Sequence, residues 1–192
     1  MADKELKNLT DEVIVAWGDV VEPRRDPQPK ALIAGVNFRV NVMKAFKAVY
    51  LSVKFYIETK KMLVTGIMNP VEVLKIPWDV YDIIIATLDA LREKMAVLDY
   101  TACVVLSNSP NGFEEKDFKE AIEKFVQIEN VDDLPLYLGF SSKRILESRK
   151  AMTSSTWFDD LLKRLDHDDW LERNGSRIKF EPRHYTWGLK ID

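Results

Sequence analysis

The chain has 192 residues and a mass of 22.2 kDa, the size of one domain or of one domain with an appended arm. Its composition is 46% hydrophobic and 31% charged, which excludes a disordered or fibrous protein. The net charge of −3 excludes a globally basic nucleic-acid binder, and the single cysteine excludes an intrachain disulfide. A charged N-terminus and the lack of about 18 consecutive uncharged apolar residues predict a cytoplasmic protein without membrane contact.

The N-terminal segment predicts a helix that stands apart as an arm. Apolar residues recur at helical spacing over residues 4–21, and Gly18 is expected to end the helix. Residues 22–30 contain three prolines, which favour neither a helix nor a central strand. We therefore expect an N-terminal helix or arm over 1–21, joined by an extended connector that lifts it off the rest.

The next segment, residues 31–68, fits two structures equally well. Apolar residues from Val36 to Ile57 suit one face of a long helix. The alternation of apolar and polar residues from Leu51 to Glu58 instead suits a strand, followed by a turn at Lys60 and Lys61 and a second strand over 62–68. Helix and hairpin both remain open.

The middle of the chain contains the clearest periodicity. Residues 78–98 present a broad apolar face and predict a helix. Residues 100–106 are short, apolar and β-branched, which predicts a buried strand. A turn is expected over 107–112 and a second helix over 114–128.

Two further helices are expected over 141–152 and 155–173, the second ended by Asn174 and Gly175. The remaining tail alternates in polarity and predicts two short strands or one bent arm. We therefore expect a single α+β domain with more helix than strand and a small, mostly antiparallel sheet. Its core would span 31–173, and 174–192 would form a C-terminal strand or arm.

Catalytic motifs are absent from the sequence. No glycine-rich phosphate loop occurs, and the helix expected from Glu114 begins with the carboxylates of Glu114, Glu115 and Asp117, which would repel an anion. Cys103 lies inside the apolar 100–106 segment, as buried packing cysteines do, and both histidines, His167 and His184, are far along the chain. We predict no catalytic residue.

An acidic cluster near residue 165 is the sharpest candidate for metal chemistry. Consecutive residues on a helix point in directions about 100° apart, so the cluster cannot face one ion, and Asp159 can pair with Lys163 instead. We predict no metal and no cofactor; a metal-dependent enzyme using the cluster is the third hypothesis. Its members are Asp159, Asp160, Asp166, His167, Asp168 and Asp169.

Charge is strongly segregated along the chain. Residues 31–78 carry a net charge of +5, and residues 79–140 carry −8. This pattern is compatible with pairing inside the chain, with a head-to-tail interface between copies, or with contact to an acidic partner or nucleic acid. Nucleic acid is the least favoured because the basic segment lacks clustered arginine. The basic side chains concerned are Lys44, Lys47, Lys54, Lys60 and Lys61.

The C-terminal residues form the second candidate interaction site. Tyr185, Trp187, Leu189 and Ile191 alternate with more polar residues and would expose an apolar row unless covered. The row either closes the domain's own sheet or adds a strand to the sheet edge of a neighbouring chain.

The missing catalytic motifs, the segregated charge and the two arm-like ends together predict a non-catalytic assembly protein, a subunit of a homo-oligomer or larger complex with protein partners. The alternative is a binding or regulatory module that contacts an acidic partner or nucleic acid through Lys44–Lys61. The order of helix, hairpin, helix and terminal strand resembles that of bacteriophage neck and tail-terminator ring proteins. That resemblance, or a baseplate role, implies ring formation, contacts with tail or capsid proteins, and a place in the virion.

Overall fold

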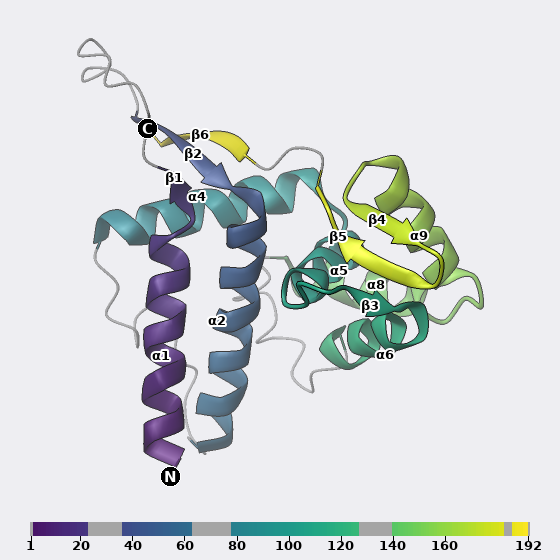
Figure 1. Cartoon of the computed structure of the whole chain (residues 1–192), viewed down its shortest axis with the longest axis horizontal. Helices are drawn as coiled ribbons and strands as arrows, with labels where there is room; N and C mark the ends of the chain where they lie inside the picture. Colours follow the sequence, from purple (N-terminus) through teal and green to yellow (C-terminus); the bar gives the residue numbers. More distant parts are fainter. Residues whose placement is uncertain (1, 23–35, 63–77, 127–139, 183–185, 192) are drawn as a thin grey trace. The chain divides into compact units, whose positions relative to one another are not determined.

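The computed structural model confirms the α+β class, with seven helices and two small antiparallel sheets among the residues it describes (Figure 1). It forms two compact units, so the expected core over 31–173 is divided. Unit 1 contains residues 1–90 and 184–192, and unit 2 contains residues 91–183. The described residues are 2–22, 36–62, 78–126, 140–182 and 186–191.

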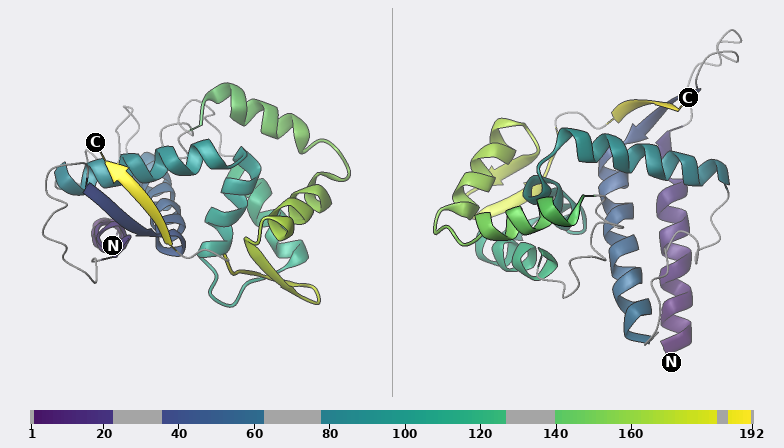
Figure 2. Two further views of the ribbon diagram at one scale, coloured as in Figure 1. Left: turned by 90° about the horizontal axis from the view of Figure 1, so that it is seen from above. Right: turned by 180° about the vertical axis from the view of Figure 1, so that it is seen from behind.

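In unit 1 the N-terminal helix is part of the fold and does not stand apart. Helix α1 (Ala2–Gly18) ends at the predicted glycine and runs antiparallel to α2 (Val42–Met62), as Figures 1 and 2 show. Val13 and Trp17 on α1 are buried, and Trp17 Nε1 donates a hydrogen bond of 2.9 Å to Ser52 Oγ on α2. The connector predicted over 22–30 lies, apart from Glu22, outside the described residues.

The ambiguous segment forms a strand followed by a helix. Asn41 Oδ1 accepts a hydrogen bond of 3.1 Å from the backbone N–H of Lys44 and so caps α2. Leu51, Val53 and Phe55, whose alternation suggested a strand, are all buried within this helix. A helix covered on more than one side buries residues two apart, which imitates strand periodicity. Of the second strand expected over 62–68, Met62 is the last residue of α2, and the rest lies outside the described residues.

A three-stranded antiparallel sheet completes unit 1, in the order β1-β2-β6. Strand β1 (Val21–Glu22) pairs with β2 (Val36–Asn41), and β2 pairs along its whole length with β6 (Thr186–Ile191). The C-terminal strand therefore pairs with the chain's own sheet, one of the two outcomes that the sequence left open.

The helix predicted over 78–98 is interrupted near its end. Helix α4 (Trp78–Lys94) is followed by a break and then by α5 (Val97–Ser107). Arg144 Nη2 donates to the carbonyl oxygen of Met95 at 3.3 Å, which satisfies a backbone group freed where α4 ends.

The prediction of a strand at 100–106 is wrong, because α5 covers this segment. Residues 100–106 are all buried, including Thr101 and Cys103. Burial on every side removes the polar face that would have revealed a helical period, and tertiary packing outweighs the strand preference of the β-branched residues. The prediction that Cys103 is a buried packing residue is confirmed.

Around α5, unit 2 places three helices and a second sheet. The helices predicted at 114–128 and 141–152 are confirmed as α6 (Glu115–Val126) and α8 (Ser142–Ala151). Strand β3 (Phe113–Glu114) lies at one edge of the sheet, whose order is β3-β5-β4. Phe118 of α6 is fully buried and packs with Phe113 and with Phe158 of the last helix.

The prediction of one helix over 155–173 is wrong in its second half. Helix α9 (Trp157–His167) is followed by a hairpin of β4 (Leu171–Asn174) and β5 (Arg177–Phe180). Asn174 and Gly175 therefore belong to the hairpin and do not end the helix. The positive φ of 63° at Gly175, the first residue of the two-residue turn, fits this connection.

The actual end of α9 uses an aspartate where glycine is usual. Trp170 N donates to Leu165 O and Asp169 N to Asp166 O, the hydrogen-bond pattern of a Schellman motif with Asp169 in the left-handed position at φ 56°. We expect Asp169→Gly to raise the free energy of unfolding by about 1 kcal/mol, because glycine adopts this conformation without steric cost. Urea denaturation measures the change, and Asp168→Gly is the control because its φ of −89° gains nothing. An equal response of both variants would contradict this account.

Candidate interaction surfaces

The lysines singled out in the sequence all lie on α2. Lys44, Lys47 and Lys54 are exposed, whereas Lys60 and Lys61 are placed only as backbone in its last turns. No acidic residue occupies the first turn of α2, where acids would complement the positive end of the helix. The five lysines predicted as one basic region thus lie on a single helix, and their binding role stays a prediction.

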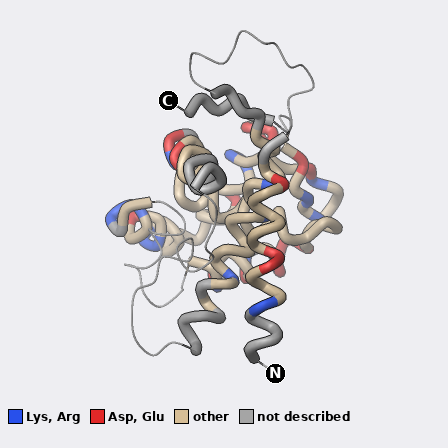
Figure 3. The backbone as a smooth tube through the Cα atoms, turned by 90° about the vertical axis from the view of Figure 1, so that its left-hand side faces the viewer, with Lys and Arg blue, Asp and Glu red and all other residues tan. Residues whose placement is uncertain are grey.

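These three exposed lysines form no ion pair with any described residue. Unit 2 differs, since three of its exposed arginines pair with carboxylates (Figure 3 marks the charged residues along the backbone). Its pairs are Arg164 with Asp99 at 2.8 Å, Arg173 with Glu115 at 3.2 Å and Arg177 with Glu114 at 3.3 Å.

Two of these lysines, Lys47 and Lys54, share a face of α2 with half-buried apolar residues. Lys47, Tyr50 and Lys54 follow one another at spacings of three and four, which places them on one side of the helix within about 60°. Met43 and Ile57 continue the same line at its two ends and are half-buried. We call residues 43, 47, 50, 54 and 57 the α2 seam; such alternation is typical of helices that pack on another helix.

The sequence of α4 repeats the three-and-four spacing of the α2 seam with acids in place of lysines. The positions concerned are Asp82, Ile85 and Asp89. Ile85 is 36% exposed and Asp89 is exposed. We call residues 82, 85 and 89 the α4 seam. In the sequence this pattern is a pair of acids seven residues apart with an apolar residue between them. The net charge of residues 79–140 does not reveal such a spacing.

The C-terminal candidates are placed by the backbone of β6. Trp187, Leu189 and Ile191 lie in this strand opposite Val40, Phe38 and Val36 of β2, and Tyr185 lies outside the described residues. Within the described part of the chain, β6 has a neighbouring strand on one side only. Its other edge pairs with no strand in that part of the chain.

Cys103 has the environment of an inert thiol. Burial raises the pKa of its thiol well above the usual value, and the nearby Asp99 carboxylate raises it further. A neutral, buried thiol is a poor nucleophile. His167 is exposed at the end of α9, and His184 lies outside the described residues, so the structure places no histidine beside Cys103.

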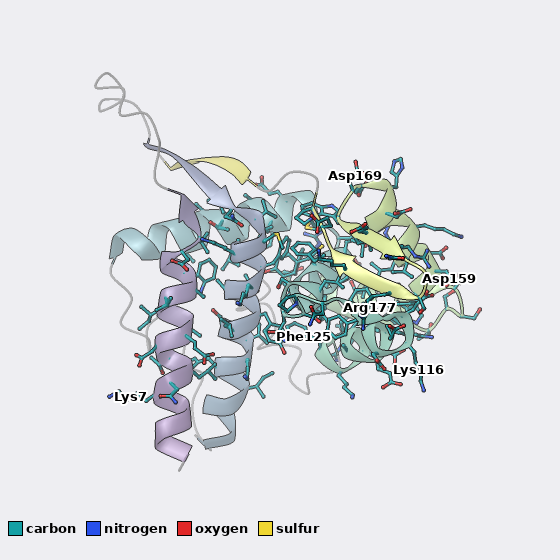
Figure 4. The ribbon with its side chains drawn as sticks, viewed as in Figure 1. Lys7, Lys116, Phe125, Asp159, Asp169 and Arg177 are labelled. Atoms are coloured by element: carbon teal, nitrogen blue, oxygen red, sulfur yellow. The ribbon has the colours of Figure 1, made fainter. Side chains whose placement is uncertain are left out.

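The acidic cluster is spread along α9 and past its end. Figure 4 shows Asp159 and Asp169 well apart, as their positions at the start of the helix and beyond its end require. Lys163 lies 4.0 Å from Asp160, and not beside Asp159 as predicted, while Asp160 accepts a hydrogen bond from Thr156 Oγ1. Among the described residues, no group of three or more His, Cys, Asp and Glu side chains could hold a metal ion.

Comparisons with known proteins provide no relative. No family model, no curated protein and no solved structure matches the chain. The element order that resembled bacteriophage ring proteins included a hairpin, and α2 occupies the part of that segment which the structure describes. No helix in the described residues is long and apolar enough to cross a membrane.

Proposed function

We propose that the protein is a non-catalytic assembly subunit whose copies associate through the outer edge of β6. The observation that supports the proposal is a six-residue strand at the edge of the β1-β2-β6 sheet. Strand edges expose backbone N–H and C=O groups that pair readily with another strand. Pairing of two β6 edges would join the sheets of two copies.

The orientation of the edge groups follows from the register. Asn41 N–H donates to Val20 O on the β1 side, so the backbone groups of Asn41 point away from β6. Asn41 lies opposite Thr186 in the ladder, so the two form a pair without mutual hydrogen bonds. Along an antiparallel ladder, successive residues point their backbone N–H and C=O groups to alternate sides of the strand. The groups of Thr186, Gly188 and Lys190 therefore point outward.

This outward row is symmetric about Gly188 and suits pairing with a second copy. An antiparallel β6–β6 pair would place Gly188 opposite Gly188 and Thr186 opposite Lys190 of the other copy. Trp187 and Leu189 of the two copies would then occupy neighbouring register positions. Such a contact uses the same surface on both partners, which is the commonest symmetry among homo-oligomers.

A proline at the centre of the outward row tests the proposal. We expect Gly188→Pro to remove the outward N–H and abolish β6 pairing without breaking a bond to β2, so that the smallest species in sedimentation velocity becomes the 22.2 kDa monomer. Leu189→Pro is the matched control, because its N–H points toward β2 and its loss should lower the thermal stability of the fold instead. Unchanged association of a folded Gly188→Pro variant would contradict the proposal.

The enclosing assembly is a separate part of the proposal. A closed arrangement of such subunits is what the likeness to bacteriophage neck and tail-terminator proteins would imply, and a virion is then the place to look for it. The likeness identifies no residue for the contact between copies. The edge of β6 is therefore the one observation that supports the proposal.

A further inference from the structure

Asparagine is followed by glycine at two places in unit 2. Asn111 and Gly112 lie in the turn before β3, and Asn174 and Gly175 lie where β4 turns into β5. Both asparagines are exposed. A glycine has no Cβ to shield its backbone nitrogen, so this nitrogen can approach the side chain of the preceding asparagine. The two turns therefore contain the same reactive pair in different surroundings.

Hydrogen bonds and close packing hold the first pair in place. Gly112 N–H donates to Ser109 O at 2.9 Å, and Gly112 O accepts a hydrogen bond of 2.7 Å from Ser109 Oγ. The space beside Gly112 is filled, because an added Cβ would collide with the backbone carbonyl oxygen of Ile178. The nitrogen of Gly112 can react only after its hydrogen bond breaks and the peptide leaves this packed position.

Neither constraint applies to the second pair. The N–H of Gly175 donates no hydrogen bond to a described residue, and the side chain of Asn174 forms none with one. An added Cβ at Gly175 would meet nothing within 4 Å, so this peptide has room to rotate. The turn is anchored one residue later, where Ser176 Oγ donates to Glu114 Oε2 at 2.7 Å and Ser176 O accepts from Glu115 N at 2.9 Å.

We propose that Asn174 is a site of spontaneous deamidation and that the fold protects Asn111 from the same reaction. The backbone nitrogen of Gly175 attacks Cγ of Asn174, the bond from Cγ to Nδ2 breaks, and ammonia leaves with the proton of the Gly175 N–H. Water then opens the resulting succinimide ring at one of its two carbonyl carbons, which gives aspartate or isoaspartate. The reaction needs no co-reactant except water.

The products differ in their effect on the hairpin. Each adds one negative charge to the turn, and isoaspartate also adds one methylene group to the backbone before Gly175. The longer backbone displaces Ser176 from its hydrogen bonds with Glu114 and Glu115. The isoaspartate form is therefore expected to unfold at a lower urea concentration than the unmodified chain.

Peptide mapping by mass spectrometry tests the proposal on the full folded chain. The protein is incubated at neutral pH, and each asparagine is followed through the mass gain that accompanies the change from amide to acid. We expect Asn174 to react about tenfold faster than Asn111 or more, because reaction at Asn111 must first break the Gly112 hydrogen bond. In denaturing urea the two should react at similar rates, because each is followed by glycine.

Two variants at position 174 serve as controls. Asn174→Gln should show no modification at this position and an unchanged rate at Asn111, because glutamine would have to close a larger ring. Asn174→Asp has the charge of the product without the added methylene group. Its urea midpoint should therefore lie above that of the isoaspartate form.

Three results would overturn the proposal. The first is an equal rate at Asn111 and Asn174 in the folded protein. The second is an unreactive Asn174 in the folded protein over a period in which the chain in urea reacts at both positions. The third is a difference in rate that persists unchanged in urea, since the flanking sequence and not the fold would then set the rates.

Discussion

Replacing Gly112 with alanine is expected to lower the free energy of unfolding of unit 2 by about 2–3 kcal/mol, since it combines two costs. Gly112 has a positive φ of 74°, which L-residues with a side chain rarely adopt. A Cβ at this position would also collide with the backbone carbonyl oxygen of Ile178 on β5. Backbone cannot rotate away as a flexible side chain can, so the β3–β5 pairing must shift.

The turn that precedes β3 explains why the backbone of Gly112 lies so close to β5. The backbone N–H of Gly112 donates to Ser109 O at 2.9 Å, and Ser109 Oγ donates to Gly112 O at 2.7 Å. The intervening proline and asparagine favour the turn. The turn directs the chain into β3, where Phe113 pairs with Ile178.

Gly175→Ala is the matched control for this prediction. Gly175 has a similar φ of 63°, but a Cβ there would meet nothing within 4 Å. We therefore expect it to cost only the conformational penalty, about 1 kcal/mol. Urea denaturation of both variants gives the difference, which is the effect of the collision. Equal destabilisation of the two would contradict the close approach at Gly112.

Raising the pH above about 9 is expected to destabilise unit 2 through two groups on α5. Burial raises the pKa of the Tyr100 hydroxyl and of the Cys103 thiol far above their usual values of about 10 and 8.5. Above those usual values the unfolded chain loses protons that the folded chain keeps. The folded state then binds more protons, so stability falls as pH rises, by about 1.4 kcal/mol per pH unit for each group.

Two conservative variants isolate this effect. Tyr100→Phe removes only the hydroxyl and keeps the ring beside Phe140, whose centroid lies 5.2 Å away. Cys103→Ala removes the thiol. The urea midpoint is measured at pH 8 and at pH 10.5 under reducing conditions. The drop in midpoint between these pH values should be smaller in each variant than in the wild type. If both variants lose as much stability as the wild type between these pH values, neither group carries the alkaline effect.

Local signals predicted much of the fold. Gly18 correctly predicted the end of α1, and the apolar stripe over 114–128 correctly predicted α6. The proline and glycine of residues 107–112 correctly predicted a turn. Residues 178–180 alternate in burial as expected of a half-buried strand. In each case one face is polar, so the sequence period reports the structure directly.

The errors arose where this contrast in polarity fails. Helix α5 is buried on all sides and has no polar face to reveal its period. Helix α9 ends at His167 and is followed by Asp169 in the left-handed conformation that glycine usually adopts. Apolar residues continue past this point into β4. Residue propensities alone could not distinguish α5 from a buried strand, or α9 from a helix that continues to residue 173.

The candidate interaction surfaces were predictable only in part. The lysines could be found from composition, but their placement on one face required knowing that residues 42–62 are helical. The pairing of β6 with β2 joins residues 36–41 to 186–191, and no local pattern specifies a partner strand so far along the chain. The α4 seam required the same helical geometry before its spacing could be compared with that of α2.

The most direct test of self-assembly is the mass of the purified full chain by light scattering at low and high salt. We expect a dimer at low salt, because two copies pair through the edge of β6. The same dimer should persist at high salt, because the backbone hydrogen bonds between the two β6 strands do not depend on charge. A mass of 22.2 kDa at both salt concentrations would contradict the account.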